Sequence, residues 1–200
     1  MNPNQAVDNS NQDWTWIQSF QAGDRSGFDQ IFRKYKSIVI NLSFRFVKDQ
    51  GIAEEIAQEV FVKIYEKKVK SDPKSKFSTW LYRVTVNASL DFLRHRKKIF
   101  YTLDQTIKSE EGNTVTFLET VADPKASHPI AGIEKEELRQ TVQREIDLLP
   151  ENLKTPLLLF QFEEMPYREI AQILGVSEKA VERRLCHAKE ALRKKLSKYV

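Results

Sequence analysis

The sequence has few of the features that characterise secreted, membrane-spanning or all-β proteins. Its single cysteine, Cys186, excludes a disulfide bond within the chain and is typical of a reducing compartment. Six glycines and seven prolines are too few for the many tight turns of an all-β fold. No apolar run approaches the roughly 20 residues that cross a bilayer, and the polar N-terminus lacks the layout of a signal peptide. We therefore expect a cytoplasmic protein without a membrane-inserted segment.

Residues suited to catalysis or metal binding are also scarce. Cys186 and His187 are adjacent, but no other cysteine or histidine lies near them in the sequence. A nucleophile with its base, or a zinc site, needs more such residues than these. No cluster of serine, arginine and acid suggests a recombinase. We expect no enzymatic activity, no metal and no cofactor.

The charged residues that are present are distributed unevenly. The formal net charge of the chain is +4. Residues 177–200 carry eight Lys or Arg against three Glu, whereas residues 99–133 carry five acids against two lysines. The chain therefore has an acidic middle and a basic end, and a basic end favours contact with nucleic acid.

Helical periodicity covers the chain on both sides of this acidic middle. On the N-terminal side it predicts helices over 14–22, 27–36, 37–48, 51–66 and 78–96. Ser26 is the expected N-cap of the second of these helices, and residues 67–76 form a polar loop. Helical patterning resumes near Glu134, with breaks at Pro150, Pro166 and Gly175.

The sequence thus predicts an all-α protein of two small helical domains joined by a flexible acidic linker. Residues 1–12 are expected to be a disordered tail, and residues 13–98 to be a helical bundle. Residues 99–133 show no sustained period, and a span this long without structure indicates a linker. Residues 134–200 form the second domain.

Within the second domain, residues 167–196 have the pattern of a helix-turn-helix. Ile170, Ala171 and Leu174 share one face of a short helix, and Gly175 follows where the turn needs a positive φ. Ser177 can cap the next helix. That helix carries an apolar stripe formed by Val181, Leu185, Ala188, Leu192 and Leu196.

The opposite side of this second helix is basic and suits DNA. Arg183 is best placed to reach base edges, where arginine can bind guanine through two hydrogen bonds, and Lys179 lies near it. Glu182 either accepts a hydrogen bond from cytosine or pairs with a neighbouring base. A solvated basic helix without a ligand is the alternative. The residues expected to face DNA are Ser177, Lys179, Glu182, Arg183, Arg184, His187 and Lys189.

The helix predicted over 51–66 has a surface that suggests a protein partner. Its core stripe is formed by Ile52, Ala53, Ile56, Val60 and Ile64. The opposite side carries Glu55, Gln58 and Val62, with Glu59 at its flank. An exposed valine among acids is typical of a protein interface, whereas a plain solvated acidic face is the alternative.

Four segments together resemble a known family. They are AEEIAQEVFVKIYE (53–66), FSTWLYRVTVNASLDFLRHRKK (77–98), LLPENLKTPLLLF (148–160) and the helix-turn-helix. In kind and order they are similar to bacterial RNA polymerase sigma factors of the extracytoplasmic function (ECF) group of the sigma-70 family. The resemblance covers a sigma-2 domain (about 15–98) and a sigma-4 domain (about 135–198).

This resemblance implies a transcription initiation factor that binds core RNA polymerase and directs it to promoters through the −10 and −35 elements and promoter opening. The alternative is a helix-turn-helix regulator that acts without being a polymerase subunit. The family's partners are core polymerase, promoter DNA and commonly an anti-sigma factor. Glu55, Gln58 and Glu59 match the family pattern that contacts the β′ clamp helices, and Val62 lies on the same face. The sigma-4 domain would sit on the β flap and read the −35 element.

The same resemblance assigns the −10 element to the helix that begins at Phe77. Its expected contacts are Trp80, Arg83, Asn87, Arg94, Arg96 and Lys97. Trp80 equally suits a core edge or a platform for stacked bases. The expected core stripes of this helix contain Phe77, Leu81, Val84, Ala88 and Phe92 on one side and Tyr82, Val86 and Leu93 on another. Leu90 is assigned to the DNA stripe, and Asp91 to the core side.

Overall fold

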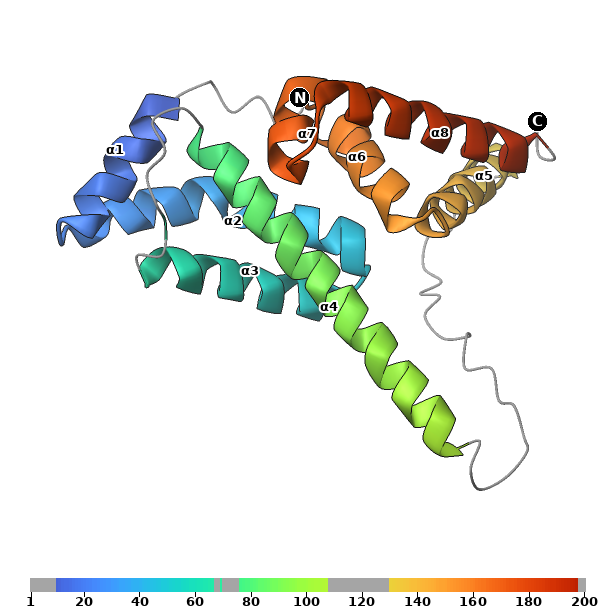
Figure 1. The fold of residues 1–200 in the computed structure, drawn as a ribbon, viewed down its shortest axis with the longest axis horizontal. Helices are drawn as coiled ribbons and strands as arrows, with labels where there is room; N and C mark the ends of the chain where they lie inside the picture. Colours follow the sequence, from blue (N-terminus) through green and yellow to red (C-terminus); the bar gives the residue numbers. More distant parts are fainter. Residues whose placement is uncertain (1–9, 67–68, 70–75, 108–129, 198–200) are drawn as a thin grey trace.

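The computed structural model describes residues 10–66, 69, 76–107 and 130–197, and all regular structure in these ranges is α-helical. Helices α1 to α4 make an N-terminal unit, and α5 to α8 make a C-terminal unit (Figure 1). The bounds are α1 Ser10–Gln21, α2 Arg25–Val47, α3 Gln50–Tyr65, α4 Phe77–Ile107, α5 Ile130–Asp147, α6 Glu151–Phe162, α7 Tyr167–Leu174 and α8 Glu178–Leu196. Within the described ranges no helix is both long and apolar enough to cross a membrane.

Helix α2 is continuous where the sequence pattern predicts two helices. Ile31, Tyr35, Val39 and Leu42 are all buried at spacings of three or four, so one apolar stripe runs through the predicted break. The N-cap is Asp24, not the predicted Ser26. The Asp24 carboxylate accepts hydrogen bonds from the Ser26 amide at 2.9 Å and the Ser26 hydroxyl at 2.8 Å. These hydrogen bonds from Ser26 lower the pKa of Asp24.

Helix α1 begins at Ser10, so residues 10–12 of the predicted tail belong to a helix, and residues 1–9 lie outside the described residues. Asp13 fastens α1 to α2, because its buried carboxylate accepts from the Tyr35 hydroxyl and the Lys34 ammonium, both at 2.6 Å. The two helices approach most closely at Gly27. A β-carbon there would lie 2.2 Å from the backbone oxygen of Trp16.

Helix α4 continues to Ile107, beyond its predicted end at 96 and into the predicted linker. Helix α5 begins at Ile130, four residues before Glu134. The helices therefore take residues from both ends of the predicted 99–133 linker. Residues 108–129 lie outside the described residues, so the flexibility of the linker stays a prediction.

The breaks predicted in the C-terminal unit are confirmed, since α5, α6 and α7 all end near them. Gly175 adopts φ +65° between α7 and α8, and the Ser177 hydroxyl accepts from the Ala180 amide at 3.2 Å. Val181, Leu185 and Ala188 are buried. One residue of the short-helix face differs: Ile173 is buried, whereas Leu174 is half-buried. The helix-turn-helix is therefore formed by α7 and α8.

Candidate nucleic-acid and polymerase interfaces

The outer face of α8 presents the basic residues predicted to face DNA. Lys179, Glu182, Arg183, His187 and Lys189 are exposed, as is the capping Ser177, and Arg184 is half-buried. The buried stripe of α8 packs against α6 and α7, so the basic residues on the other side of the helix face solvent. The Lys189 ammonium lies 5.2 Å from the centre of the Phe160 ring, which draws its side chain toward α6.

The predicted protein-binding face of α3 is also exposed. Glu55, Gln58, Glu59 and Val62 all lie away from the buried stripe, and Val62 is 51% exposed. Tyr65, three residues after Val62, is 52% exposed and was missed by the sequence prediction. Its ring packs edge-on against Phe28 at 5.4 Å. The spacing of three from Val62 would have placed Tyr65 on the same side of the helix.

The structure corrects the predicted α4 pattern at Leu90 and Asp91. Leu90 is buried and does not belong to an exposed stripe, whereas Asp91 is exposed and pairs with Arg94 at 3.1 Å. Trp80 is half-buried and stacks on Phe77 with 5.7 Å between ring centres, which favours the core-edge interpretation. Arg83 and Asn87 are exposed. Arg96 and Lys97, two and three residues after Arg94, are exposed as well.

The predicted core faces of α4 also need correction. Val84, Ala88, Phe92 and Leu93 are only half-buried. Thr85 and Ser89 are fully buried instead. Their hydroxyls donate to the backbone oxygens of Leu81 and Thr85, each at 2.9 Å. This bond to the preceding turn satisfies the hydroxyl without a partner from another helix.

Two arginines of the predicted DNA stripe contact the C-terminal unit. The Arg83 guanidinium donates to the backbone oxygen of Gln172 in α7. The Arg94 guanidinium donates to the Glu151 carboxylate at the start of α6. Figure 1 shows the C-terminal unit lying alongside α4, with α7 near the beginning of that helix. Neither contact was predicted from the sequence.

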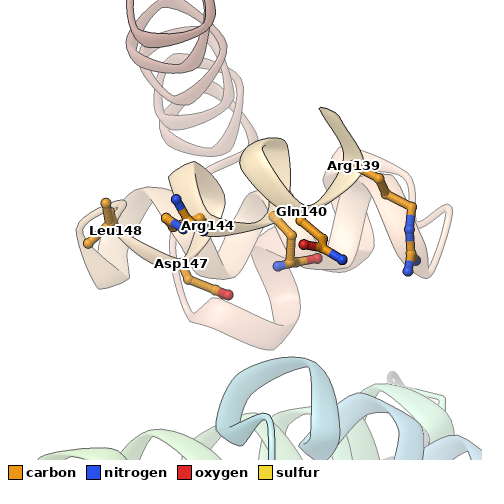
Figure 2. A pocket seen from close by; sticks show the side chains of 6 residues that line it. Arg139, Gln140, Arg144, Asp147 and Leu148 are labelled. Atoms are coloured by element: carbon orange, nitrogen blue, oxygen red, sulfur yellow. The ribbon is translucent and has the colours of Figure 1, made fainter. Parts of the chain in front are cut away.

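A cavity of about 400 Å³ lies along α5 (Figure 2), and none of the predicted site residues lines it. It is lined by Arg139, Gln140, Gln143, Arg144, Asp147 and Leu148. Arg139 is held by Glu136 at 2.8 Å, so it is not a free anion-binding group. In the parts of the chain that the structure describes, no three His, Cys, Asp or Glu residues converge as metal ligands.

A helix-turn-helix with an exposed basic second helix, beside a bundle with an exposed acidic and apolar helix, defines a DNA-binding transcription factor with a protein partner. The sigma-70 region 2 family model matches residues 31–99, and the sigma-70 region 4 model matches residues 139–192. The chain belongs to the ECF group of sigma-70 family sigma factors, as its similarity to curated relatives also shows. It is a transcription initiation factor that acts with RNA polymerase, and sigma factors are not enzymes.

Two curated relatives illustrate this similarity. The chain is 34% identical over 180 residues to the ECF RNA polymerase sigma factor SigW of Bacillus subtilis, covering 90% of this chain and 94% of the relative. It is 31% identical over 185 residues to the RNA polymerase sigma-H factor of Pseudomonas aeruginosa, covering 92% and 94%. A regulator that acts without polymerase is not favoured by these relatives.

Two solved structures share the fold. CnrH, in complex with the cytosolic domain of CnrY, has a TM-score of 0.64 at 19% identity, covering 93% of this chain and 97% of that one. The sigma factor RpoE of Bartonella quintana, in complex with the anti-sigma factor NepR, has a TM-score of 0.63 at 17% identity, covering 87% and 98%. The fold class is therefore confirmed as two helical sigma domains.

Proposed function

We propose that three helices of this sigma factor have separate binding roles: α3 binds polymerase, α4 reads the −10 element and α8 reads the −35 element. The observation that carries the proposal is the exposed basic face of α8, whose opposite side is fixed in the core. A rigid helix with such a face fits the major groove of duplex DNA.

In the −35 contact, Arg183 and Lys179 reach base edges, and Ser177, Arg184, His187 and Lys189 contact the backbone. Phosphate contacts fix the register of the helix but do not read sequence, whereas arginine at guanine does. Glu182 lies on the same exposed side, where its carboxylate can accept from a cytosine amine. Glu182 therefore tunes which −35 sequence is preferred.

In the polymerase contact, Glu55, Gln58 and Glu59 meet the β′ clamp helices, with Val62 supplying the apolar centre. Val62 and Tyr65 lie three residues apart on α3 and are 51% and 52% exposed, so two large apolar side chains share the exposed side of the helix with the acids, as suits a protein interface. The C-terminal unit sits on the β flap, for which exposed Leu138 on α5 and Leu148, just after the end of α5, offer apolar contacts. This factor acts in the cytoplasm, where core polymerase is found.

In the −10 contact, Arg83, Asn87 and Arg94 hold the unpaired strand, with Arg96 and Lys97 on its phosphates. Single-stranded DNA is bound by a positive groove together with stacking rings. Trp80 contributes only the exposed part of a ring that already stacks on Phe77. The acidic segment between the units threads toward the active-centre channel, where growing RNA displaces it.

An anti-sigma factor is the remaining proposed partner. Both structural neighbours form a complex with a second protein, the cytosolic domain of CnrY for CnrH and the anti-sigma factor NepR for RpoE. A likeness of fold supports the same kind of regulation for this chain.

The polymerase contact is tested by Glu59→Arg, with Asp29→Arg as the matched control. Both acids are exposed, but Asp29 belongs to α2 and is not part of the proposed α3 face. Glu59→Arg should abolish co-purification with core polymerase and leave the circular dichroism spectrum unchanged, whereas Asp29→Arg should still co-purify. Normal co-purification of Glu59→Arg would rule out this face.

A further inference from the structure

We propose that Phe160 of α6 is a positioning residue of the −35 interface, because its ring holds the Lys189 ammonium where that group binds a DNA phosphate. Phe160 precedes the helix-turn-helix and was not among the residues expected to face DNA. The inference rests on the proposed −35 role of α8, and it names a residue outside that helix on which one of the DNA contacts depends.

Phe160 lies where three helices meet. The Lys189 ammonium of α8 lies 5.2 Å from the centre of the Phe160 ring, within the roughly 6 Å over which the face of an aromatic ring attracts a cation. On α7, the Tyr167 ring lies 5.5 Å from the Phe160 ring, with 58° between the two planes. One ring of α6 therefore contacts side chains of both helices of the helix-turn-helix.

The position of the Phe160 ring is fixed by the core of the C-terminal unit. The three leucines directly before it, 157 to 159, are buried, and Phe160 itself is half-buried beside Tyr167. A packed ring has few rotamers, whereas a lysine has a flexible four-carbon stem. The contact between the two therefore restricts Lys189 and leaves the ring where it is.

The ring holds Lys189 without neutralising it. Near the end of the same helix, Lys195 is held by the Glu145 carboxylate at 2.8 Å, and such a partner offsets the charge that would attract a phosphate. A ring carries no net charge, so Lys189 keeps its positive charge, and its side chain remains exposed. The ammonium has three hydrogen-bond donors, and those directed away from the ring can reach a phosphate oxygen.

Lys189 also lies on the part of α8 that suits a phosphate contact. It follows buried Ala188 and therefore lies at the edge of the exposed face, whereas Arg183 lies near the middle of that face. When a helix enters the major groove, the middle of its outer face meets base edges, and its flanks meet the backbones that border the groove. Phe160 holds Lys189 at such a flank, on the side of α6.

Holding the side chain in advance strengthens the contact. A free lysine loses its rotamer freedom when it binds, and this loss weakens affinity by about two- to tenfold for one such side chain. The Phe160 ring imposes most of that restriction before DNA arrives. Removing the ring should therefore weaken DNA binding although the charge of Lys189 remains.

The test uses holoenzyme assembled from core polymerase and an excess of the full-length protein. Its affinity is measured at several salt concentrations for a labelled promoter duplex that the wild-type holoenzyme selects from a randomised library. The variants are Phe160→Leu, Lys189→Gln and the two combined. Phe160→Tyr keeps the ring, and Phe160→Met is a second variant without one. Co-purification with core polymerase and circular dichroism check that every variant is assembled and folded.

We expect Lys189→Gln to weaken binding to all sequences about equally and to reduce the salt slope by about one, as for a lost phosphate contact. Phe160→Leu and Phe160→Met should each weaken binding about two- to tenfold, with the salt slope of the wild type. Phe160→Tyr should bind like the wild type. The combined variant should bind no more weakly than Lys189→Gln alone, because Phe160 acts on DNA only through Lys189.

Lys179→Gln is the matched control for this coupling. Lys179 lies ten residues before Lys189, about 15 Å along α8, so its effect should simply add to that of Phe160→Leu. A purely structural role of Phe160 would give additive effects with both lysines.

Additive effects of Phe160→Leu and Lys189→Gln would overturn the positioning role, as would unchanged or tighter binding by Phe160→Leu. If Lys189→Gln binds like the wild type with the same salt slope, the proposed phosphate contact fails and the positioning role fails with it. A defect in Lys189→Gln without coupling to Phe160 would leave the phosphate contact standing and overturn only the role of Phe160.

Discussion

Replacing Arg183 with alanine tests how α8 reads DNA. The substitution is structurally mild, because Arg183 is exposed and the helix is held by Val181 and Leu185 on its other side. Among the described residues, Arg183 has no ion pair that the change would break. We therefore expect an unchanged free energy of unfolding and a defect confined to DNA binding.

The size of that defect follows from the contact being lost. A good two-bond pair between arginine and guanine discriminates against the wrong base by about 1–3 kcal/mol. At one position of the −35 element this is about a 5- to 150-fold loss of preference. A phosphate contact would instead weaken all sequences about equally and reduce the salt dependence of binding.

The assay is transcription by core polymerase from promoters that differ at single −35 positions. Arg193→Ala, an exposed base in the last turn of α8, serves as the phosphate-contact control. Arg183→Ala should flatten the preference at one base pair and leave the others intact. An equal loss on every promoter, as expected for Arg193→Ala, would reduce Arg183 to a backbone contact.

Two further predictions concern the N-terminal unit. Gly27→Ala should destabilise it by about 1–3 kcal/mol in urea unfolding, because the new β-carbon would meet the Trp16 backbone. Gly51→Ala is the control and should not destabilise the unit, because a β-carbon fits at Gly51. Equal stability of the two variants would contradict the close approach of α1 and α2. Burial and a neighbouring carboxylate raise the pKa of Tyr35 and Tyr82 above 10.0. Their contribution to stability is therefore complete below about pH 10 and is lost above it. Absorbance titration should show both ionising only as helical circular dichroism is lost, and ionisation in the intact fold would refute this.

The helix-turn-helix was predictable because its signals are local. Gly175 and Ser177 act within a few residues of themselves, and the stripe from Val181 to Ala188 repeats at helical spacing. Such a pattern fixes which side is buried and therefore which side is left for DNA. The exposed face of α3 was predictable for the same reason.

Helix α4 was less predictable, because burial of polar residues breaks the correspondence between hydropathy and position. Thr85 and Ser89 are buried with their hydroxyls bonded to the preceding turn, whereas Phe92 remains half-exposed. A prediction based on apolar residues alone therefore places the buried face of α4 at the wrong angle around the helix axis. The same error in the predicted face explains why Leu90 was predicted to face DNA and Asp91 to face the core.

The contacts between the two units could not be predicted from periodicity. Tyr82 and Glu163 are 81 residues apart in sequence, and Arg94 and Glu151 are 57 apart. Neither partner carries a local signal for the other. The sequence showed Arg83 and Arg94 as exposed bases suited to DNA, and the structure adds that the chain itself contains competing acceptors for both.

The central claim is that one chain supplies core polymerase with two separate DNA-reading surfaces. It is tested most directly by mapping transcription starts from a library randomised across both promoter elements, with the wild type, Asn87→Ala and Arg183→Ala. We predict starts that require the protein and share two blocks of preferred sequence. Arg183→Ala should alter only the upstream block and Asn87→Ala only the downstream block. The absence of protein-dependent starts, or an identical change in both variants, would contradict the account.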